Sequence, residues 1–144
     1  MINPESHIAE VNMDIAVRFA RPGDRNNWLA LWFDYLSKAG LASDDKKGIA
    51  TWQRIMDMNS SLICWVAEVD NHIAGFAVAV VQDCALETDP ICCIEHIYVM
   101  EELRGNGLGK ALIQAIKLER DFAGWSKIYW LSASLTRHQT FLVN

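Results

Sequence analysis

The chain has 144 residues, of which 51% are hydrophobic and 22% are charged, and its formal net charge is −5 at pH 7. This length fits one domain with a substantial core, and the composition is ordinary for a globular protein. No apolar run approaches the roughly 20 residues of a membrane-spanning helix. The acidic balance and the scattered Lys and Arg residues argue against a nucleic-acid partner.

The N-terminus has neither the basic start nor the apolar core of a secretory signal. We therefore expect a loose leader over residues 1–13 and a single domain over residues 14–144. The four cysteines form no CxxC pair and have no histidine at a spacing suited to zinc. They indicate free thiols in a reducing compartment, a cytoplasmic location and no metal site.

The first third of the chain predicts one strand and two amphipathic helices. Alternating apolar side chains predict a strand over Ile15–Ala20, and Asp24 is placed to cap a helix that runs to about Lys38. Ser43-Asp44-Asp45 opens a second predicted helix, which runs to about Met58. Tryptophans on the inward faces of both helices fit a substrate pocket or, as we interpret them, the core; they are Trp28, Trp32 and Trp52.

Three strands follow. Leu62–Val69 and Ile73–Gln82 are joined by Asp70-Asn71, a turn-forming pair that predicts an antiparallel hairpin. The nearly all-apolar run Ile91–Met100 predicts a central strand that is covered on both faces.

The remainder predicts a helix over residues 107–123, with Phe122 among its buried side chains, and a strand over Lys127–Ala133. Residues 134–144 are too few to assign, and the start of a further helix is one interpretation of them. A strand, a helix and another strand in succession imply a parallel pair with a right-handed crossover. The expected fold is therefore mixed α/β around one twisted, mostly antiparallel sheet.

Between the central strand and the last helix lies the turn Arg104–Gly109, RGNGLG. Its three alternate glycines let the backbone approach a ligand closely and tolerate positive φ. The amides at the start of the helix are unpaired donors at the positive end of a helix dipole, so they suit a phosphate or pyrophosphate. The alternative is a plain connector, but three glycines would then cost about 1 kcal/mol each in helix stability without a reason.

Two nucleotide-binding loops do not match this turn. A P-loop requires Ser or Thr after Gly-Lys, where this chain has Ala111, and it requires four residues between its glycines, where only three separate Gly105 from Gly109. The dinucleotide fingerprint G-x-G-x-x-G has a different glycine spacing and belongs near the start of a fold.

A third pattern, Arg/Gln-x-x-Gly-x-Gly/Ala, matches Arg104–Gly109 in full. Ile97-Tyr98-Val99 before it, Lys110-Ala111-Leu112-Ile113 after it and the order of elements up to about Ala133 complete the pattern. In these features the chain resembles the GNAT superfamily of acetyl-CoA-dependent N-acetyltransferases. Glu101 stands where the family usually has a proline.

The resemblance implies a GNAT-like acyl-CoA N-acyltransferase fold, with acyl-CoA bound between two splayed parallel strands and no metal. Those strands are Ile91–Met100 and Lys127–Ala133. The residues expected to bind the cosubstrate are Ile97, Tyr98, Val99, Arg104, Gly105, Asn106, Gly107, Leu108, Gly109 and Lys110.

Transfer of an acetyl group to a primary amine needs a base to deprotonate the ammonium. Glu95 lies where similar enzymes often carry a catalytic glutamate that works through water, and a carboxylate in an apolar strand is expensive to bury without a partner. The alternative is a solvent-facing or salt-bridged glutamate. In a regular strand His96 points to the opposite face, where a core histidine is the simpler interpretation.

The family usually continues beyond the fifth strand with a helix that bears a tyrosine, which often protonates the leaving thiolate, and with further strands. Tyr129, the last tyrosine of this chain, lies within the fifth strand. We expect that this shorter C-terminus lacks that helix and the further strands, and that a homodimer covers the exposed sheet edge.

The sequence therefore favours an N-acetyltransferase that acts on the primary amine of a small molecule. The alternatives are a catalytically impaired acyl-CoA-binding protein and an interaction module that keeps only the fold. The resemblance implies an acceptor pocket formed by the first two helices and the loops, here Asp24–Ser60 and Asp83–Pro90. Acidic residues in these segments would attract a polyamine or aminosugar, or would form a solvated charged face; they are Asp44, Asp45, Glu87 and Asp89.

Overall fold

A computed structural model describes residues 13–42, 44–133 and 138–144. The helices and strands are, in chain order, β1 Ile15–Phe19, the 3-10 turn η1 Pro22–Asp24, α2 Arg25–Lys38, α3 Asp45–Met56, β2 Leu62–Val69, β3 His72–Gln82, β4 Ile91–Val99, the 3-10 turn η2 Glu101–Leu103, α4 Leu108–Ala123, β5 Ile128–Ala133 and β6 His138–Val143. They agree with the predicted ranges to within a few residues. The expected leader lies outside the described residues except for Met13.

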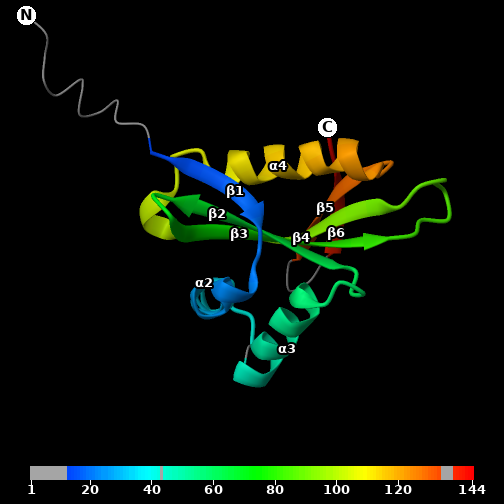
Figure 1. Ribbon diagram of the computed structural model, residues 1–144. Coiled ribbons are helices and arrows are strands. Elements are labelled where there is room, and N and C mark those ends of the chain that lie inside the picture. Colours follow the sequence, from blue (N-terminus) through cyan, green and yellow to red (C-terminus); the bar gives the residue numbers. More distant parts are fainter. Residues whose placement is uncertain (1–12, 43, 134–137) are drawn as a thin grey trace, which may run out of the picture.

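The strands form one sheet in the order β1-β2-β3-β4-β5-β6. Only β4 and β5 are parallel, and the other neighbours are antiparallel. Figure 1 shows α4 over one face of the sheet and α2 and α3 over the other. The mixed α/β fold and its parallel pair are therefore confirmed. Among the described helices, none is long and apolar enough to cross a membrane.

The predicted hairpin between β2 and β3 is confirmed. Its two turn residues both lie in the left-handed region, with φ of 51° at Asp70 and 69° at Asn71. This is the geometry of a type I′ turn, whose twist matches that of the flanking strands.

Each face of the sheet has its own hydrophobic cluster. On one face, Leu108, Leu112 and Ile116 of α4 pack against apolar side chains of the strands, including Ile94 and Ile128. On the other face, the three tryptophans of α2 and α3 are buried around Phe76. The interpretation of these tryptophans as core residues is therefore confirmed, although Trp32 also lines a pocket described below.

Asp24 occupies the N-cap position of α2, but its carboxylate does not cap that helix. It accepts hydrogen bonds from the Arg21 amide at 2.7 Å and from the Arg18 guanidinium at 2.7 and 2.9 Å. Arg18 also donates to Glu68 of β2 at 2.6 Å. Hydrogen bonding to Arg18 lowers the pKa of the buried Asp24 carboxyl. This network joins β1, η1 and β2 at a distance from the pockets described below.

The expected capping of α2 by Asp24 is therefore absent, and the expected burial of Phe122 is wrong. Phe122 is 88% exposed, because it lies six residues after the buried Ile116 and is turned away from the buried stripe at about 100° per residue. The tail, which the sequence left unassigned, forms β6 over 138–143, antiparallel to β5, with Ile128 opposite Val143. Pairing with β5 satisfies the backbone groups of β6, whereas a short isolated helix would be only marginally stable.

Candidate active site

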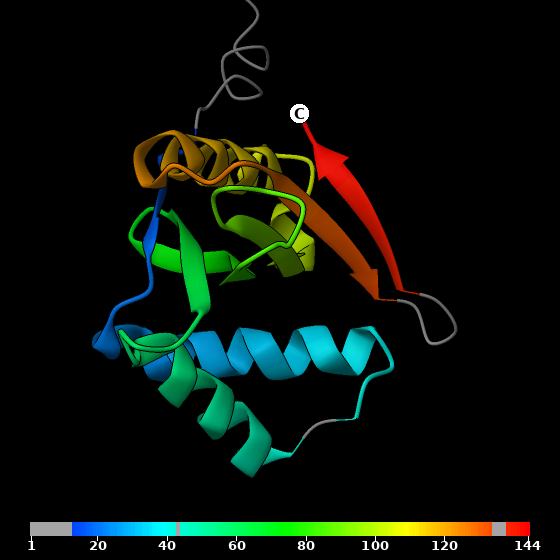
Figure 2. The same ribbon diagram turned by 90° about the vertical axis from the view of Figure 1, so that its right-hand side faces the viewer.

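β4 and β5 separate after a short stretch of parallel pairing. Their register runs from Cys92 opposite Ile128 to Ile94 opposite Trp130. Beyond this point the edge of β4 that faces β5, over residues 95–99, is not paired with β5. Figure 2 shows β5 and β6 as a separate two-stranded ribbon along one side of the molecule. The expected splay of the parallel pair is present.

A β-bulge marks the point where the strands part. On β3, Val78 lies opposite His96 and the next residue, Ala79, lies opposite Ile94, so Glu95 has no partner in the register. A bulge of this kind bends the strand and re-aims the side chains around it. Glu95 is therefore the residue at which β4 changes direction.

The bulge also changes which face His96 occupies. Ile94 belongs to the cluster under α4, whereas His96 packs edge-on against Trp32 of α2, with ring centroids 5.1 Å apart. In a regular strand these two residues would share a face. The expectation that Glu95 and His96 point to opposite faces does not hold, because the strand is not regular there. The charge that acts on Glu95 belongs to Arg54 of α3, on the same side of the sheet as His96.

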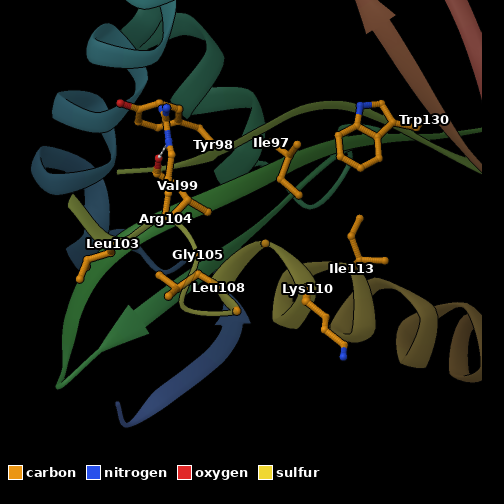
Figure 3. Close-up of a pocket in the computed structure, with 12 residues that line it drawn as sticks. Ile97, Tyr98, Val99, Leu103, Arg104, Gly105, Leu108, Lys110, Ile113 and Trp130 are labelled. Atoms are coloured by element: carbon orange, nitrogen blue, oxygen red, sulfur yellow. Dashed lines mark hydrogen bonds between the residues drawn. The ribbon is translucent and has the colours of Figure 1, made fainter. Parts of the chain in front are cut away.

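A pocket of about 480 Å³ lies between the free part of β4, the glycine turn and the start of α4. It is lined by Ile97, Tyr98, Val99, Leu103, Arg104, Gly105, Gly107, Leu108, Gly109, Lys110, Ile113 and Trp130. In Figure 3, Ile97 of β4, Trp130 of β5 and Ile113 of α4 lie around one end of this pocket, and the glycine turn lies at the other. We call it the α4-side pocket.

The glycine turn presents bare backbone to this pocket. Gly105 and Gly107 have φ of +83° and +90°, values that residues other than glycine rarely adopt. Gly109 has no such φ, and a Cβ added to it would meet no atom within 4 Å. The first helical hydrogen bond runs from the Ala111 amide to the Gly107 carbonyl at 2.9 Å. The amides of residues 108–110 therefore precede the hydrogen-bonded ladder of α4 and remain available as donors.

The side chains of the turn hold it to β4. The Arg104 guanidinium donates to the Val99 carbonyl at 3.0 Å and lies 5.5 Å from the centre of the Tyr98 ring. The Asn106 side chain donates to the carbonyls of Leu103 at 3.0 Å and Arg104 at 3.4 Å. Asn106 thus stabilises the turn and, unlike the other nine residues expected to bind the cosubstrate, does not line the pocket.

Tyr98 links this turn to α2. Its hydroxyl donates to Asp34, and Lys38 lies 3.3 Å from that hydroxyl and 3.2 Å from the Asp34 carboxylate. The hydrogen bond from Tyr98 lowers the pKa of Asp34. Because α2 covers the face opposite α4, the cluster couples the two sides of the sheet beside the splay.

A second pocket, of about 400 Å³, lies on that opposite face between α2, α3 and β4. It is lined by Trp32, Leu36, Leu41, Ala42, Lys47, Gly48, Ala50, Thr51, Arg54 and His96. We call it the α3-side pocket. His96 and Ile97 are consecutive, so the two pockets adjoin the same point of β4 from the two faces of the sheet.

The ionisable groups at this point have shifted pKa values. Burial raises the pKa of Glu95, an effect that the positive charge of Arg54 opposes. Burial lowers the pKa of His96, whose Nδ1 lies 2.7 Å from the Tyr35 hydroxyl. A raised carboxyl pKa is a property of general bases that work near neutral pH, whereas a histidine whose pKa is lowered is uncharged at that pH.

The four cysteines are free, and burial raises the pKa of Cys92 to about 12. Such a thiol is not a nucleophile at neutral pH. Among the described residues, no group of three His, Cys, Asp or Glu side chains is arranged to hold a metal ion.

Sequence reasoning missed three residues of the α4-side pocket. Leu103 and Ile113 flank the glycine motif, and Trp130 faces it from β5. Only the periodic spacing of side chains along a strand or a helix could have indicated them in the sequence.

For the α3-side pocket, sequence reasoning gave the segment Asp24–Ser60, which holds every lining residue except His96, but it did not single out the polar residues of α3. Lys47, Thr51 and Arg54 recur at helical spacing on α3, but they belong to no motif.

Known proteins share this architecture. A family model described as "Acetyltransferase (GNAT) domain" matches residues 60–141. The D-amino-acid N-acetyltransferase HPA3 of Saccharomyces cerevisiae is 25% identical over 125 residues, which are 85% of this chain and 77% of the relative.

Solved structures agree in fold. The aminoglycoside N-acetyltransferase AAC(6')-Iy in complex with CoA has a TM-score of 0.72 at 20% identity, over 88% of this chain and 82% of that one. The ribosomal-protein-alanine N-acetyltransferase from Brucella melitensis biovar Abortus 2308 has a TM-score of 0.70 at 22% identity, over 81% and 78%. Since the family model spans more than half of the chain and the fold agrees with it, the chain belongs to the GNAT acetyltransferase family.

Proposed function

We propose that this protein transfers the acetyl group of acetyl-CoA to a primary amine of a small molecule. The observation that carries the proposal is the glycine turn at the mouth of the α4-side pocket. It combines donor amides, two glycines at positive φ and a third glycine that nothing in the protein explains.

Gly109 is the sharpest test of whether a phosphate-bearing ligand fits this turn. A glycine near the start of a helix lowers helix stability by about 1 kcal/mol relative to alanine. Neither φ nor packing requires it, because a Cβ there would meet no atom within 4 Å. Room for a ligand at the helix N-terminus, where its dipole favours an anion, accounts for this glycine. The residues present therefore fit a pyrophosphate.

The remainder of the pocket fits the pantetheine arm. The free edge of β4 offers backbone groups to an extended chain, in the manner of an added strand. Ile97, Ile113 and Trp130 provide an apolar surface beside it. We assign to the cosubstrate the lining residues of the turn and of β4, with Asn106 acting through the shape of the turn.

We propose that Glu95 is the general base. It lies at the bulge beside both pockets, and its raised pKa favours accepting a proton near neutral pH. Glu95 would take the proton of the acceptor ammonium, directly or through one water. Acetyl-CoA supplies a thioester: the amine nitrogen bonds to its carbonyl carbon, the C–S bond breaks, the thiolate leaves with the electron pair, and the second amine proton passes to solvent.

The relatives suggest which amines to try first. One is named for D-amino acids, another for aminoglycosides, and a third for the alanine of a ribosomal protein. These names define three classes of acceptor, namely a free amino acid, an aminoglycoside and an alanine of a protein.

We further propose a homodimer and a cytoplasmic location. β6 is an edge strand that carries Phe141 and Leu142, which are 53% and 52% exposed, and an apolar edge favours pairing with a second copy. The four free cysteines favour a reducing compartment. A monomeric mass in sedimentation at micromolar concentration would overturn the dimer.

Two measurements test the central proposal. Calorimetry with acetyl-CoA should show binding, and thiol release should depend on one of the three classes of amine. Binding without thiol release from any of them would favour an acyl-CoA-binding protein that does not catalyse transfer. No binding would leave only the interaction module.

A further inference from the structure

We propose that the acceptor carries a carboxylate beside its reacting amine, as an α-amino acid does, and that Arg54 binds this carboxylate in the α3-side pocket. The inference rests on the proposed acetyl transfer and names its substrate class. It is carried by the charges of the pocket and by the position of the pocket beside Glu95.

The lining of the α3-side pocket is positively charged. Among the described residues that line it are two cations, Lys47 and Arg54, and no carboxylate. Lys47, Thr51 and Arg54 lie at intervals of four and three residues on α3, so they share one face of that helix. A polyamine or aminoglycoside with several positive charges would be repelled by this face.

Neither cation has a carboxylate partner within 4.0 Å in the described part of the chain, where the ion pairs of lysine and arginine involve Arg18, Lys38, Arg120 and Lys127. The only side-chain hydrogen bond of the Arg54 guanidinium there is a long one to the Thr51 hydroxyl, at 3.4 Å. That hydroxyl itself donates to the Lys47 carbonyl at 3.0 Å. The guanidinium N–H groups of Arg54 are therefore available to donate two parallel hydrogen bonds to a carboxylate, the bidentate arrangement that arginine favours.

Two of the four acidic residues expected to attract a cationic acceptor have partners elsewhere. Asp44 caps α3, where its carboxylate accepts from the Lys47 amide at 2.8 Å. Glu87 forms an ion pair with Lys127 at 2.6 Å. Neither residue lines the α3-side pocket, so the negative net charge of the chain does not describe this site.

The α3-side pocket offers a partner to each charged group of an amino acid. His96 lines the pocket and directly follows Glu95, so an amine bound beside His96 lies near the proposed base. Arg54 lines the same pocket and carries the charge that a carboxylate needs, and its charge reaches Glu95, where it opposes the rise in pKa that burial causes. Trp32, Leu36 and Leu41 form an apolar wall suited to a hydrophobic side chain. The arrangement selects a compact acceptor with one amine and one carboxylate.

The test compares three acceptors that differ at one group: leucine, leucinamide and isopentylamine, with the amino acid and its amide in both D and L forms. With saturating acetyl-CoA, we expect kcat/KM to be highest for leucine in at least one hand. In Arg54→Gln, kcat/KM for leucine should fall by about tenfold to a hundredfold, the usual size of a charge-assisted hydrogen bond, while that for leucinamide changes by less than about twofold.

Lys46→Gln is the matched control, because Lys46 neighbours Lys47 on α3 but does not line the pocket. It removes the same charge and should leave the selectivity for leucine unchanged. Arg54→Lys keeps the charge but not the planar fork, so it should fall between the wild type and Arg54→Gln. A thermal melt of each variant checks that the fold is retained.

The inference is overturned if the wild type acetylates leucinamide or isopentylamine as well as leucine, or if Arg54→Gln lowers all three equally; either result leaves acetyl transfer itself intact. If no amine is acetylated, the proposed function fails, and calorimetry with leucine in the presence of CoA decides the inference separately. Binding to the wild type that Arg54→Gln abolishes supports it. No binding to the wild type, or equal binding to both, overturns it.

Discussion

The two pockets beside the point where β4 and β5 separate differ in the parts of the chain that line them. The α4-side pocket consists largely of backbone and apolar surface, presented by one continuous stretch of chain from β4 to α4, with Trp130 added from β5. The α3-side pocket consists of side chains from α2, α3 and β4, which lie far apart in the sequence. Backbone donors fit a cosubstrate that does not change, whereas exchangeable side chains suit the part of a site that determines specificity. A sequence motif therefore identifies the α4-side pocket, whereas no motif identifies the α3-side pocket.

The largest expected effect is at the junction of the two pockets. Glu95→Gln should lower kcat by about 10²–10⁴-fold, the range of general base catalysis, because the amide cannot accept the proton. The acetyl-CoA affinity should stay within about twofold of the wild type, since Glu95 lines neither pocket. Stopped-flow thiol release and calorimetry measure the two quantities. Unchanged turnover would remove Glu95 as the base.

The next effect is confined to the α4-side pocket. Gly109→Ala should weaken acetyl-CoA binding by about tenfold, or about 1.4 kcal/mol, because its methyl group enters space left for the phosphate. The same change should raise the free energy of unfolding by about 0.4–1 kcal/mol, since alanine restricts the unfolded chain and favours the helix. Opposite signs for binding and stability distinguish a ligand site from a packing defect.

Gly23→Ala is the control for this variant. Gly23 also has open space around its Cβ position and no positive φ, but it lies in η1, outside the pocket. It should leave the acetyl-CoA affinity unchanged. Equal affinities for Gly109→Ala and the wild type would indicate a turn that binds no phosphate.

The pH dependence should also locate the chemistry at the junction. Because burial raises the pKa of Glu95, kcat/KM should fall by about tenfold per pH unit below an apparent pKa that lies above the ordinary value of a glutamate. Glu95→Gln should abolish this limb. A limb that survives in the variant would assign the titration to another group.

The same shift predicts a change in stability with a definite sign. A carboxyl whose pKa is raised by folding contributes stability below its unfolded pKa and loses that contribution as pH rises through the folded value. Glu95→Gln should therefore be more stable than the wild type at neutral pH, and the difference should vanish at low pH. Chemical denaturation at the two pH values measures it.

The smallest effect should occur outside both pockets. Phe122→Ser should change the free energy of unfolding by less than about 0.5 kcal/mol, because its side chain is 88% exposed. Ile116→Ala, on the buried stripe of the same helix, should cost about 2–5 kcal/mol. Comparable losses in the two variants would mean that Phe122 is covered, for example by a second copy of the chain.

Local patterns predicted most of the fold. The alternation of β1, the hairpin turn at Asp70 and Asn71 and the start of α3 at Asp45 depend on neighbours in the sequence, and all three are present. The glycine turn was equally readable, because its spacing excludes other loops. The errors lie where tertiary contacts decide. Phe122 fits an apolar pattern but falls off the buried stripe, and the tail becomes a strand because β5 offers an edge.

The details of the acceptor side of the site could not be predicted from the sequence, because they also depend on tertiary contacts. The face of His96 depends on the bulge at Glu95, which exists only in the pairing of β4 with β3. The charge of the α3-side pocket depends on which side chains line it, and Lys47 and Arg54 line it without a carboxylate partner among the described residues. The acidic residues of the neighbouring segments suggested a cationic acceptor, whereas the pocket that adjoins the proposed base is itself cationic.

Backbone amide chemical shifts, recorded while CoA and then leucine are added, test the two-pocket account most directly. We predict that CoA shifts the signals of residues 97–99 and 105–110, and that leucine then shifts those of residues 47–54 and His96. Unmoved signals of residues 105–110 on adding CoA, or the same set of signals shifted by both ligands, would show that the two pockets do not bind as proposed.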